Sequence, residues 1–393
     1  MKILTQYILL DLIATFLATL ISMTVFVLVF LVGDEAIDKG LGLSAVLRTI
    51  PYFLPQAMAL TVPGTMLLAT TIVYGRVASG NEIVAVKSLG VTPMSLVKPA
   101  LILAAITSVG AVWLNDIAVS WGRDGVQRVF FESLEQIALG RLESQGSFTF
   151  GEWEVNVAAV QGGTLIHPVV RKNTAGGPPW LIDADTAEVR VDKQHNSLVF
   201  KLLNAEGEVK GRVFSLPGEF EQEVTFDELT GRGRSSRSPS QYALREIGPA
   251  KAEQLHRLEV LGEETATDTA FTLITGGSAD TARGDDPQRR RQHAHATALL
   301  HRFGTEPHRR WSGGFSCLSF VLIGAPMAIR RRHGEFWGSF FACFLPILIV
   351  FYPMLAVTVD QAKDGGVPPV AVWLGNLVLA AWGVLLLRRV LRY

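Results

Sequence analysis

Four basic side chains border long apolar stretches of this sequence and are candidates for binding phosphate groups. Ammonium and guanidinium groups donate charge-assisted hydrogen bonds to phosphate oxygens, which would suit the head group of a phosphorylated lipid. The alternative is that each side chain only extends from an apolar surface to a membrane boundary, as long basic side chains commonly do. The four residues are Lys39, Arg48, Arg309 and Arg310.

A second candidate site is the short polar segment of residues 75–90, which lies between two apolar stretches. Ser79 and Glu82 have capping-box spacing, in which the serine side chain accepts from a free N–H of the first turn and the glutamate reaches back to the serine N–H. Gly90 can end the helix in the left-handed conformation, and Pro93 prevents its continuation. We therefore expect a short helix that is capped by Ser79.

This short helix would carry an apolar surface that it cannot bury alone. The large apolar residues of the segment are Ile83, Val84, Val86 and Leu89, and a helix of this length is unstable in isolation. We expect another surface to cover these side chains. The alternative is that Glu82 only caps a helix within a loop.

The sequence offers little for enzymatic chemistry. It contains no G-x-x-x-x-G-K-[ST] motif, so we do not expect this chain to bind and hydrolyse a nucleotide by itself. It also contains no H-E-x-x-H or G-x-S-x-G motif. His293, His295, His301 and His308 lack the spacing and the cysteine or carboxylate partners of a standard metal site. We expect neither an enzyme nor a metal or other cofactor bound to this chain.

The composition is typical of a membrane protein. Of 393 residues, 49% are hydrophobic and only 18% are charged, and the zero net charge gives no support to nucleic-acid binding. A spanning helix needs about 20 mostly apolar residues. Six stretches meet this length: residues 12–32, 54–74, 95–117, 312–329, 337–359 and 369–387. We predict a helical membrane domain with three spans on each side of a long insertion.

The basic residues of the short loops predict the orientation in the membrane. Cytoplasmic loops carry an excess of lysine and arginine, and one side of the six spans has such an excess. This side includes both termini and the segment of residues 75–90. The predicted spans contain almost no ionisable residues, which disfavours coupling to an ion gradient and favours a large amphipathic cargo.

The insertion follows the first three spans (residues 1–117) and has three parts. Residues 118–146 have one apolar face at helical spacing, so we expect an amphipathic helix along the membrane or under the next domain. In residues 147–230 the period changes to two, which is typical of an antiparallel β domain. Residues 231–307 are polar, and we expect them to be partly flexible with a helix around residues 249–261. The remaining spans occupy residues 308–393.

Three segments resemble the lipopolysaccharide-export permease family LptF/LptG, also called YjgP/YjgQ. They are residues 76–90 directly after the second span, with Arg76, Ser79 and Glu82; the predicted hairpin of residues 181–209; and Glu306-x-His308-Arg309-Arg310 before the fourth span. The resemblance implies six transmembrane helices and an inserted periplasmic antiparallel β-jellyroll. It also implies that residues 79–90 form a coupling helix in a groove of a separate ATPase. The contacting residues would be Arg76, Glu82, Ile83, Val84 and Lys87.

By the same resemblance, the chain is one permease subunit of an ATP-driven, ABC-type exporter in the bacterial inner membrane, with both termini cytoplasmic. It would pair with a related six-span subunit and with a dimeric cytoplasmic ATPase, which would bind the ATP. The complex would extract lipopolysaccharide or a related glycolipid and pass it to a periplasmic β-jellyroll bridge protein.

Two alternatives remain open for the function. One is a permease of the lipoprotein-releasing or macrolide-export type, which typically has four spans. The other is a membrane scaffold without transport activity. The sequence departs from the LptF/LptG pattern in its long polar insertion between about Gly231 and Pro307.

Overall fold

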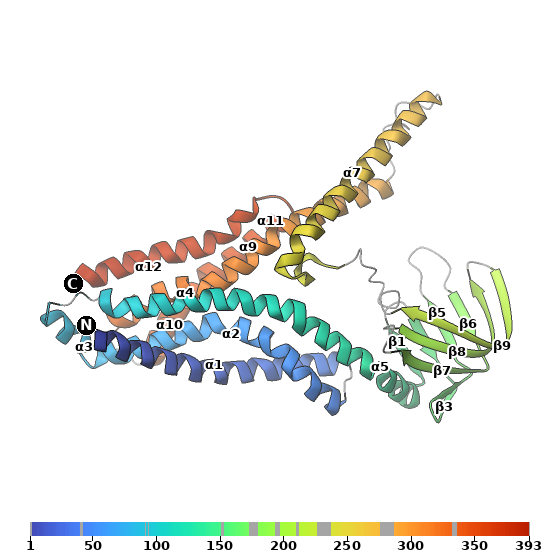
Figure 1. Cartoon of the computed structure of the whole chain (residues 1–393), viewed down its shortest axis with the longest axis horizontal. Helices are drawn as coiled ribbons and strands as arrows, with labels where there is room; N and C mark the ends of the chain where they lie inside the picture. Colours follow the sequence, from blue (N-terminus) through green and yellow to red (C-terminus); the bar gives the residue numbers. More distant parts are fainter. Residues whose placement is uncertain are drawn as a thin grey trace. The chain divides into compact units, whose positions relative to one another are not determined.

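The computed structural model describes residues 2–39, 42–90, 92, 94–150, 153–172, 180–192, 197–209, 212–225, 237–275, 287–331 and 336–392. The chain forms two compact units, and Figure 1 shows the course of the chain through both. One unit comprises Met1–Phe30, Phe53–Gly122 and Ser238–Tyr393, and the other comprises Leu31–Tyr52 and Arg123–Arg237. Each unit has its own hydrophobic core.

Among the described residues, six helical segments are long and apolar enough to cross a membrane. They confirm the predicted arrangement of three spans, an insertion and three more spans. The helices of these spans are α1 (Lys2–Lys39), α2 (Leu43–Ser79), α4 (Met94–Ile117), α9 (Pro287–Arg330), α10 (Phe336–Pro346) continued by η4 (Ile347–Phe351) and α11 (Tyr352–Lys363), and η5 (Pro369–Trp373) continued by α12 (Leu374–Arg392). The short helix α3 (Glu82–Ser88) connects α2 to α4.

Helix α9 is the central element of the first unit, because it packs against α4, α10, α11 and α12. Glycines allow this close packing. The backbone of Gly314 lies against Ser108 and Val112 of α4, and Gly324 faces Leu67 of α2. Small residues commonly bring helices together in membranes, where the surrounding lipid is as apolar as the side chains.

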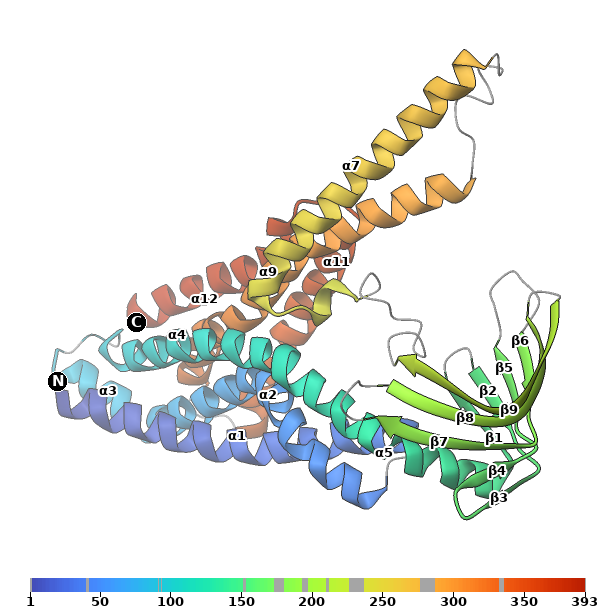
Figure 2. The same cartoon turned by 45° about the vertical axis from the view of Figure 1, so that its right-hand side comes forward.

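The region predicted as a polar, partly flexible insertion is mostly helical where the structure describes it. After η3 (Pro239–Gln241), α7 extends from Leu244 to Ile274, which confirms the predicted helix around residues 249–261 and lengthens it to 31 residues. Helix α9 already begins at Pro287, far before the predicted fourth span. The two helices pack side by side (Figures 1 and 2), and the Gln254 side chain donates to the Ala296 carbonyl at 3.2 Å.

The described residues of the second unit form a curled antiparallel sheet of nine strands (Figure 2), which confirms the predicted β-rich insertion. The strands are β1 (Ser147–Phe150), β2 (Trp153–Asn156), β3 (Ala159–Gln161), β4 (Thr164–Ile166), β5 (Val169–Lys172), β6 (Trp180–Asp183), β7 (Thr186–Asp192), β8 (Ser197–Val209) and β9 (Arg212–Thr225). Their order is β1-β2-β5-β6-β8-β7-β4-β3, and β9 also pairs with β8. The long strand β8 therefore joins three neighbours.

Helix α5 (Arg123–Gln145) follows the short π-helix η1 (Ala118–Gly122) and packs against β1, β3 and β7. Its Leu142 is buried in the core of this unit together with Leu165 and Leu202. The amphipathic face predicted for residues 118–146 thus covers the sheet. On the exposed face of the sheet, Lys201 pairs with Glu219 at 2.9 Å, and this hydrogen bond raises the lysine pKa.

Candidate functional site

The segment of residues 75–90 forms a helix, but its start differs from the predicted capping box. Ser79 is the last residue of α2, and its hydroxyl donates to the Arg76 carbonyl at 3.0 Å. Asn81 has a left-handed backbone with φ of 58°, and its carbonyl accepts from the Ala85 N–H at 3.0 Å. Asparagine tolerates this conformation better than most residues, so α3 begins after Asn81. Gly90 has φ of 75°, which confirms the predicted left-handed end.

Helix α3 is buried on one face and exposed on the other. Ile83 and Val86 belong to the core cluster of the first unit, and Ile83 is 7% exposed. By contrast, Val84 is 49% exposed and Leu89 is 80% exposed. Ile83 and Val84 were predicted to form one contact surface, and the structure places them on different faces. The side chain of Lys87 lies outside the described part of the chain, and Glu82 is half-buried.

Two polar contacts join the helices that flank α3 to each other and to α1. Tyr74 of α2 is fully buried, and its hydroxyl donates to the Leu96 carbonyl of α4 at 2.7 Å. Arg76, at the end of α2, donates to the Asp11 carboxylate of α1. The residues on both sides of α3 are therefore attached to α1, α2 and α4.

A second cluster forms where Arg309 and Arg310 share one carboxylate. Glu306, one turn earlier in α9, accepts two hydrogen bonds from Arg309 at 2.6 and 2.9 Å and one from Arg310 Nε at 3.0 Å. The Arg310 side chain is 0% exposed. Arg310 Nη1 donates to Asp116 Oδ1 at 3.3 Å, and Nη2 donates to the carbonyls of Ser240 and Tyr242 at 3.2 and 2.7 Å.

This geometry changes the interpretation of the four predicted head-group residues. Arg310 binds protein groups in place of the predicted lipid phosphate, because a fully buried guanidinium cannot reach a head group in this conformation. Arg309 is partly exposed and remains a candidate. Arg48 is exposed on α2, and Lys39 is the last residue of α1, with its side chain outside the described residues. Both belong to the second unit.

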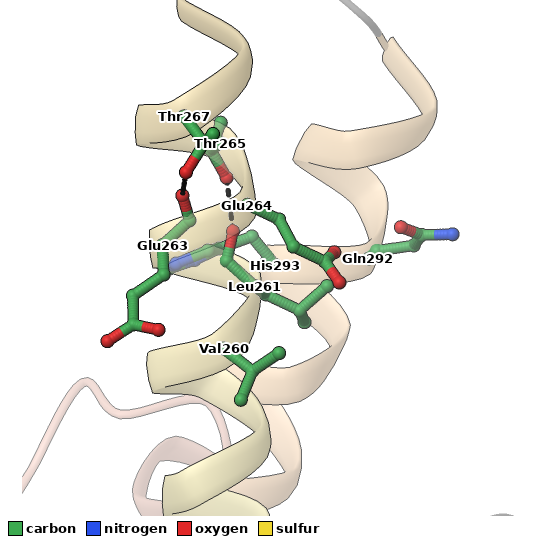
Figure 3. A pocket seen from close by; sticks show the side chains of 8 residues that line it. All are labelled: Val260, Leu261, Glu263, Glu264, Thr265, Thr267, Gln292 and His293. Carbon is green, nitrogen blue, oxygen red and sulfur yellow. Dashed lines mark hydrogen bonds between the residues drawn. The ribbon is translucent and has the colours of Figure 1, made fainter. Parts of the chain in front are cut away.

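A pocket of about 630 Å³ lies between α7 and the first half of α9 (Figure 3). Glu263 and Glu264 of α7 and Gln292 and His293 of α9 contribute to its lining. In Figure 3, Glu264 extends toward α9 and Glu263 extends away from it. Among the described residues, no group of three or more histidine, cysteine, aspartate or glutamate side chains could hold a metal ion. We therefore assign no metal chemistry to this pocket.

The family described as lipopolysaccharide export system permease LptF/LptG matches residues 6–389, nearly the whole chain. This chain belongs to the LptF/LptG family. A comparison with curated proteins gave no match. The matched range includes the β-rich unit and all of the candidate spans except the first residue of the first span and the last two residues of the sixth. The protein is therefore a multi-pass membrane permease of lipopolysaccharide export.

Sequence reasoning missed three residues of this LptF/LptG permease that fix its candidate sites. Tyr74 was assigned only to an apolar span, although a tyrosine inside a span needs a partner for its hydroxyl. Asp11 lies directly before the predicted first span, and its partner Arg76 lies 65 residues away. Asp116 lies near the end of the predicted third span. A charged residue in an apolar helix was the available signal in the last two cases.

Proposed function

We propose that this LptF/LptG permease is one subunit of an ATP-driven, ABC-type glycolipid exporter, and that a separate dimeric ATPase acts on it through α3. The observation that carries this proposal is that α3 is buried on one face and exposes apolar side chains on the other. Val84 and Leu89 offer an exposed apolar surface that a partner can bury, whereas Ile83 and Val86 pack into the helical core. A partner that moves α3 therefore also moves the helices beneath it.

The contacts next to α3 support this transmission of force. The Tyr74 hydroxyl joins α2 to the first turn of α4, and the Arg76–Asp11 pair joins the end of α2 to α1. A buried hydroxyl that lost its acceptor would remain desolvated without a hydrogen bond, which is unfavourable. We therefore expect the ends of α1, α2 and α4 to move together with α3.

The remaining parts of the proposal follow from the family and the charge pattern. The two termini and α3 would lie in the cytoplasm and the β-rich unit in the periplasm, since the basic short loops favour this orientation. The permease would pair with a related six-span subunit in the bacterial inner membrane. Lipopolysaccharide or a related glycolipid would pass to the β-rich unit and then to a periplasmic β-jellyroll bridge protein. The ATPase, and not this chain, would bind ATP.

Substitution of an exposed residue of α3 tests the proposal. Val84→Glu places a carboxylate on the exposed surface, where it should be tolerated by the isolated permease because surface changes usually have small effects on stability. In the complex this carboxylate would be buried without a partner, so co-purification of the ATPase should fall at least about tenfold. Leu43→Glu is the matched control, because Leu43 is an equally apolar, 77% exposed residue at the other end of α2.

The outcomes separate a permease from a scaffold. Loss of the ATPase with Val84→Glu and its retention with Leu43→Glu would support the proposed contact. If Val84→Glu retained the ATPase as fully as the unmodified chain, α3 would not be the contact surface. If the unmodified chain itself purified without any ATPase, the non-transporting scaffold would be favoured.

A further inference from the structure

Arg310 lies where both ends of the chain segment Arg123–Arg237, which carries all of the described strands, connect to the helical unit. The chain leaves the helical unit through η1, directly after α4, and returns to it at Ser238, directly before η3. Asp116 precedes the outgoing connection, and Ser240 and Tyr242 follow the returning one. The Arg310 guanidinium donates to all three of these residues. In addition, η1 and η3 are in contact with each other.

Arg310 and Glu306 are buried at the centre of the cluster, Arg309 and Asp116 are partly exposed at its edge, and the charges balance. Two guanidinium groups, from Arg309 and Arg310, face two carboxylates, from Glu306 and Asp116. Burial of a charged group is unfavourable unless it is paired and hydrogen-bonded, and Arg310 meets this condition with four hydrogen bonds. Such a cluster is stable only while all of its partners stay in place, so it holds three separate segments of the chain together.

Asp116 also contacts the returning connection directly. Its Oδ1 accepts from the backbone N–H of Leu244, the first residue of α7, at 2.7 Å. The returning segment is therefore held by two of its carbonyls through Arg310 and by one of its N–H groups through Asp116. Backbone groups are present at every position, so no side-chain pattern in residues 238–244 could show this attachment.

We propose that Arg310 is a positioning residue for lipid transfer, which fixes the two connections of the strand-bearing segment Arg123–Arg237 to each other and to α4 and α9. This inference rests on the proposed function, because transfer of lipid to the β-rich unit is the step that it serves. Helix α4 links the two sites: its first turn accepts the Tyr74 hydrogen bond, and its last turn carries Asp116. Movement that enters at α3 can then reach both connections through a single rigid helix.

The attachment itself is tested by hydrogen exchange on the full-length protein in detergent. Arg310→Lys keeps the charge, but an ammonium group has three N–H donors for four acceptors. We expect the Leu244 amide to exchange at least about tenfold faster, because loss of a hydrogen bond to a charged donor shifts a local opening equilibrium by about this factor. Arg302→Lys is the matched control, since Arg302 is exposed on the same helix, and it should leave this exchange unchanged.

The role in transfer is tested by reconstituting the complete exporter in vesicles that contain lipopolysaccharide. The quantity measured is lipid transferred per ATP hydrolysed. We expect Arg310→Lys to lower the lipid transferred per ATP at least about fivefold. Assembly with the ATPase and the rate of ATP hydrolysis should stay unchanged, because Arg310 is far along the chain from α3 and the ATPase itself is unaltered. If Arg310→Lys does not assemble, Asp116→Ala replaces it in both measurements, since this substitution removes the acceptor of the Leu244 N–H and one acceptor of Arg310.

Each outcome decides the inference. Faster exchange together with less lipid per ATP supports it. Unchanged exchange at Leu244 overturns the inference, and so does faster exchange with an unchanged amount of lipid per ATP. An equal loss of assembly, ATP hydrolysis and lipid transfer would also overturn it, because Arg310 would then have only a structural role. If the unmodified complex hydrolyses ATP but transfers no lipid, the proposed function fails while the exchange measurement still decides the attachment.

Discussion

The packing of α9 against α4 provides a matched pair of positions, Gly313 and Gly314, for testing the helical core. A Cβ atom added to Gly314 would lie 2.4 Å from Val112 Cγ2 and 2.9 Å from the Ser108 carbonyl oxygen. A Cβ atom added to Gly313 would have no neighbour within 4 Å. The two glycines are consecutive in the same helix, so they differ in their surroundings and not in their secondary structure.

The magnitude of the effect follows from this difference. Replacing a helical glycine by alanine stabilises the helix by about 1 kcal/mol through backbone entropy, and this gain is the same at both positions. At Gly314 the new methyl group meets a backbone oxygen that cannot rotate away, so α4 and α9 must separate. Overpacking of this kind costs about 1–3 kcal/mol. We therefore expect Gly314→Ala to be about 1–3 kcal/mol less stable than Gly313→Ala.

Denaturant titration of the two variants in the same detergent measures this difference directly. The transition can be followed by helical circular dichroism, with the unmodified protein as the reference. We expect Gly313→Ala to be at least as stable as the reference, and Gly314→Ala to unfold at a lower denaturant concentration than Gly313→Ala. Equal stability of the two variants, or a more stable Gly314→Ala, would refute the close approach of α9 and α4.

Three further substitutions at two positions, Tyr74 and Glu306, test the buried polar contacts. Tyr74→Phe removes the hydroxyl that donates to the Leu96 carbonyl but keeps the ring, so it should lower the free energy of unfolding by about 1 kcal/mol; an unchanged denaturation midpoint would contradict this hydrogen bond. Glu306→Ala removes the shared acceptor of Arg309 and Arg310 and leaves buried positive charge, so it should cost about 3–5 kcal/mol. Glu306→Gln keeps one acceptor oxygen, so it should lower the free energy of unfolding less than Glu306→Ala does. Equal stability of the unmodified protein, Glu306→Ala and Glu306→Gln in the same titration would show that the cluster is not buried.

The membrane spans and the β-rich insertion could be predicted because their patterns are local. An uninterrupted apolar stretch of about 20 residues has few other uses than crossing a membrane, and alternation with a period of two identified strands such as β7 and β8. The helical pair of α7 and the first half of α9 was predicted only in part, as a helix around residues 249–261, because its polar composition is also typical of a flexible insertion. The predicted end of the insertion, near Pro307, lies inside α9.

The candidate sites were less predictable because their partners are far apart in the sequence. Arg310 and Asp116 are separated by 194 residues, so neither residue could reveal the other. The capping box at Ser79 failed for a different reason. A serine three residues before a glutamate also fits the end of one helix followed by a turn, and Gly80-Asn81 provides that turn. Since Asn81 alone marks the boundary, the spacing did not distinguish the two arrangements.

Reconstitution of the purified chain in vesicles tests the central claim most directly, namely that a separate ATPase drives this permease. The measurement is the transfer of labelled lipopolysaccharide to a soluble acceptor, with this chain and a related six-span subunit, in the presence or absence of the ATPase and ATP. We predict transfer only when the permease subunits, the ATPase and ATP are all present. Transfer at the same rate without the ATPase would contradict the account.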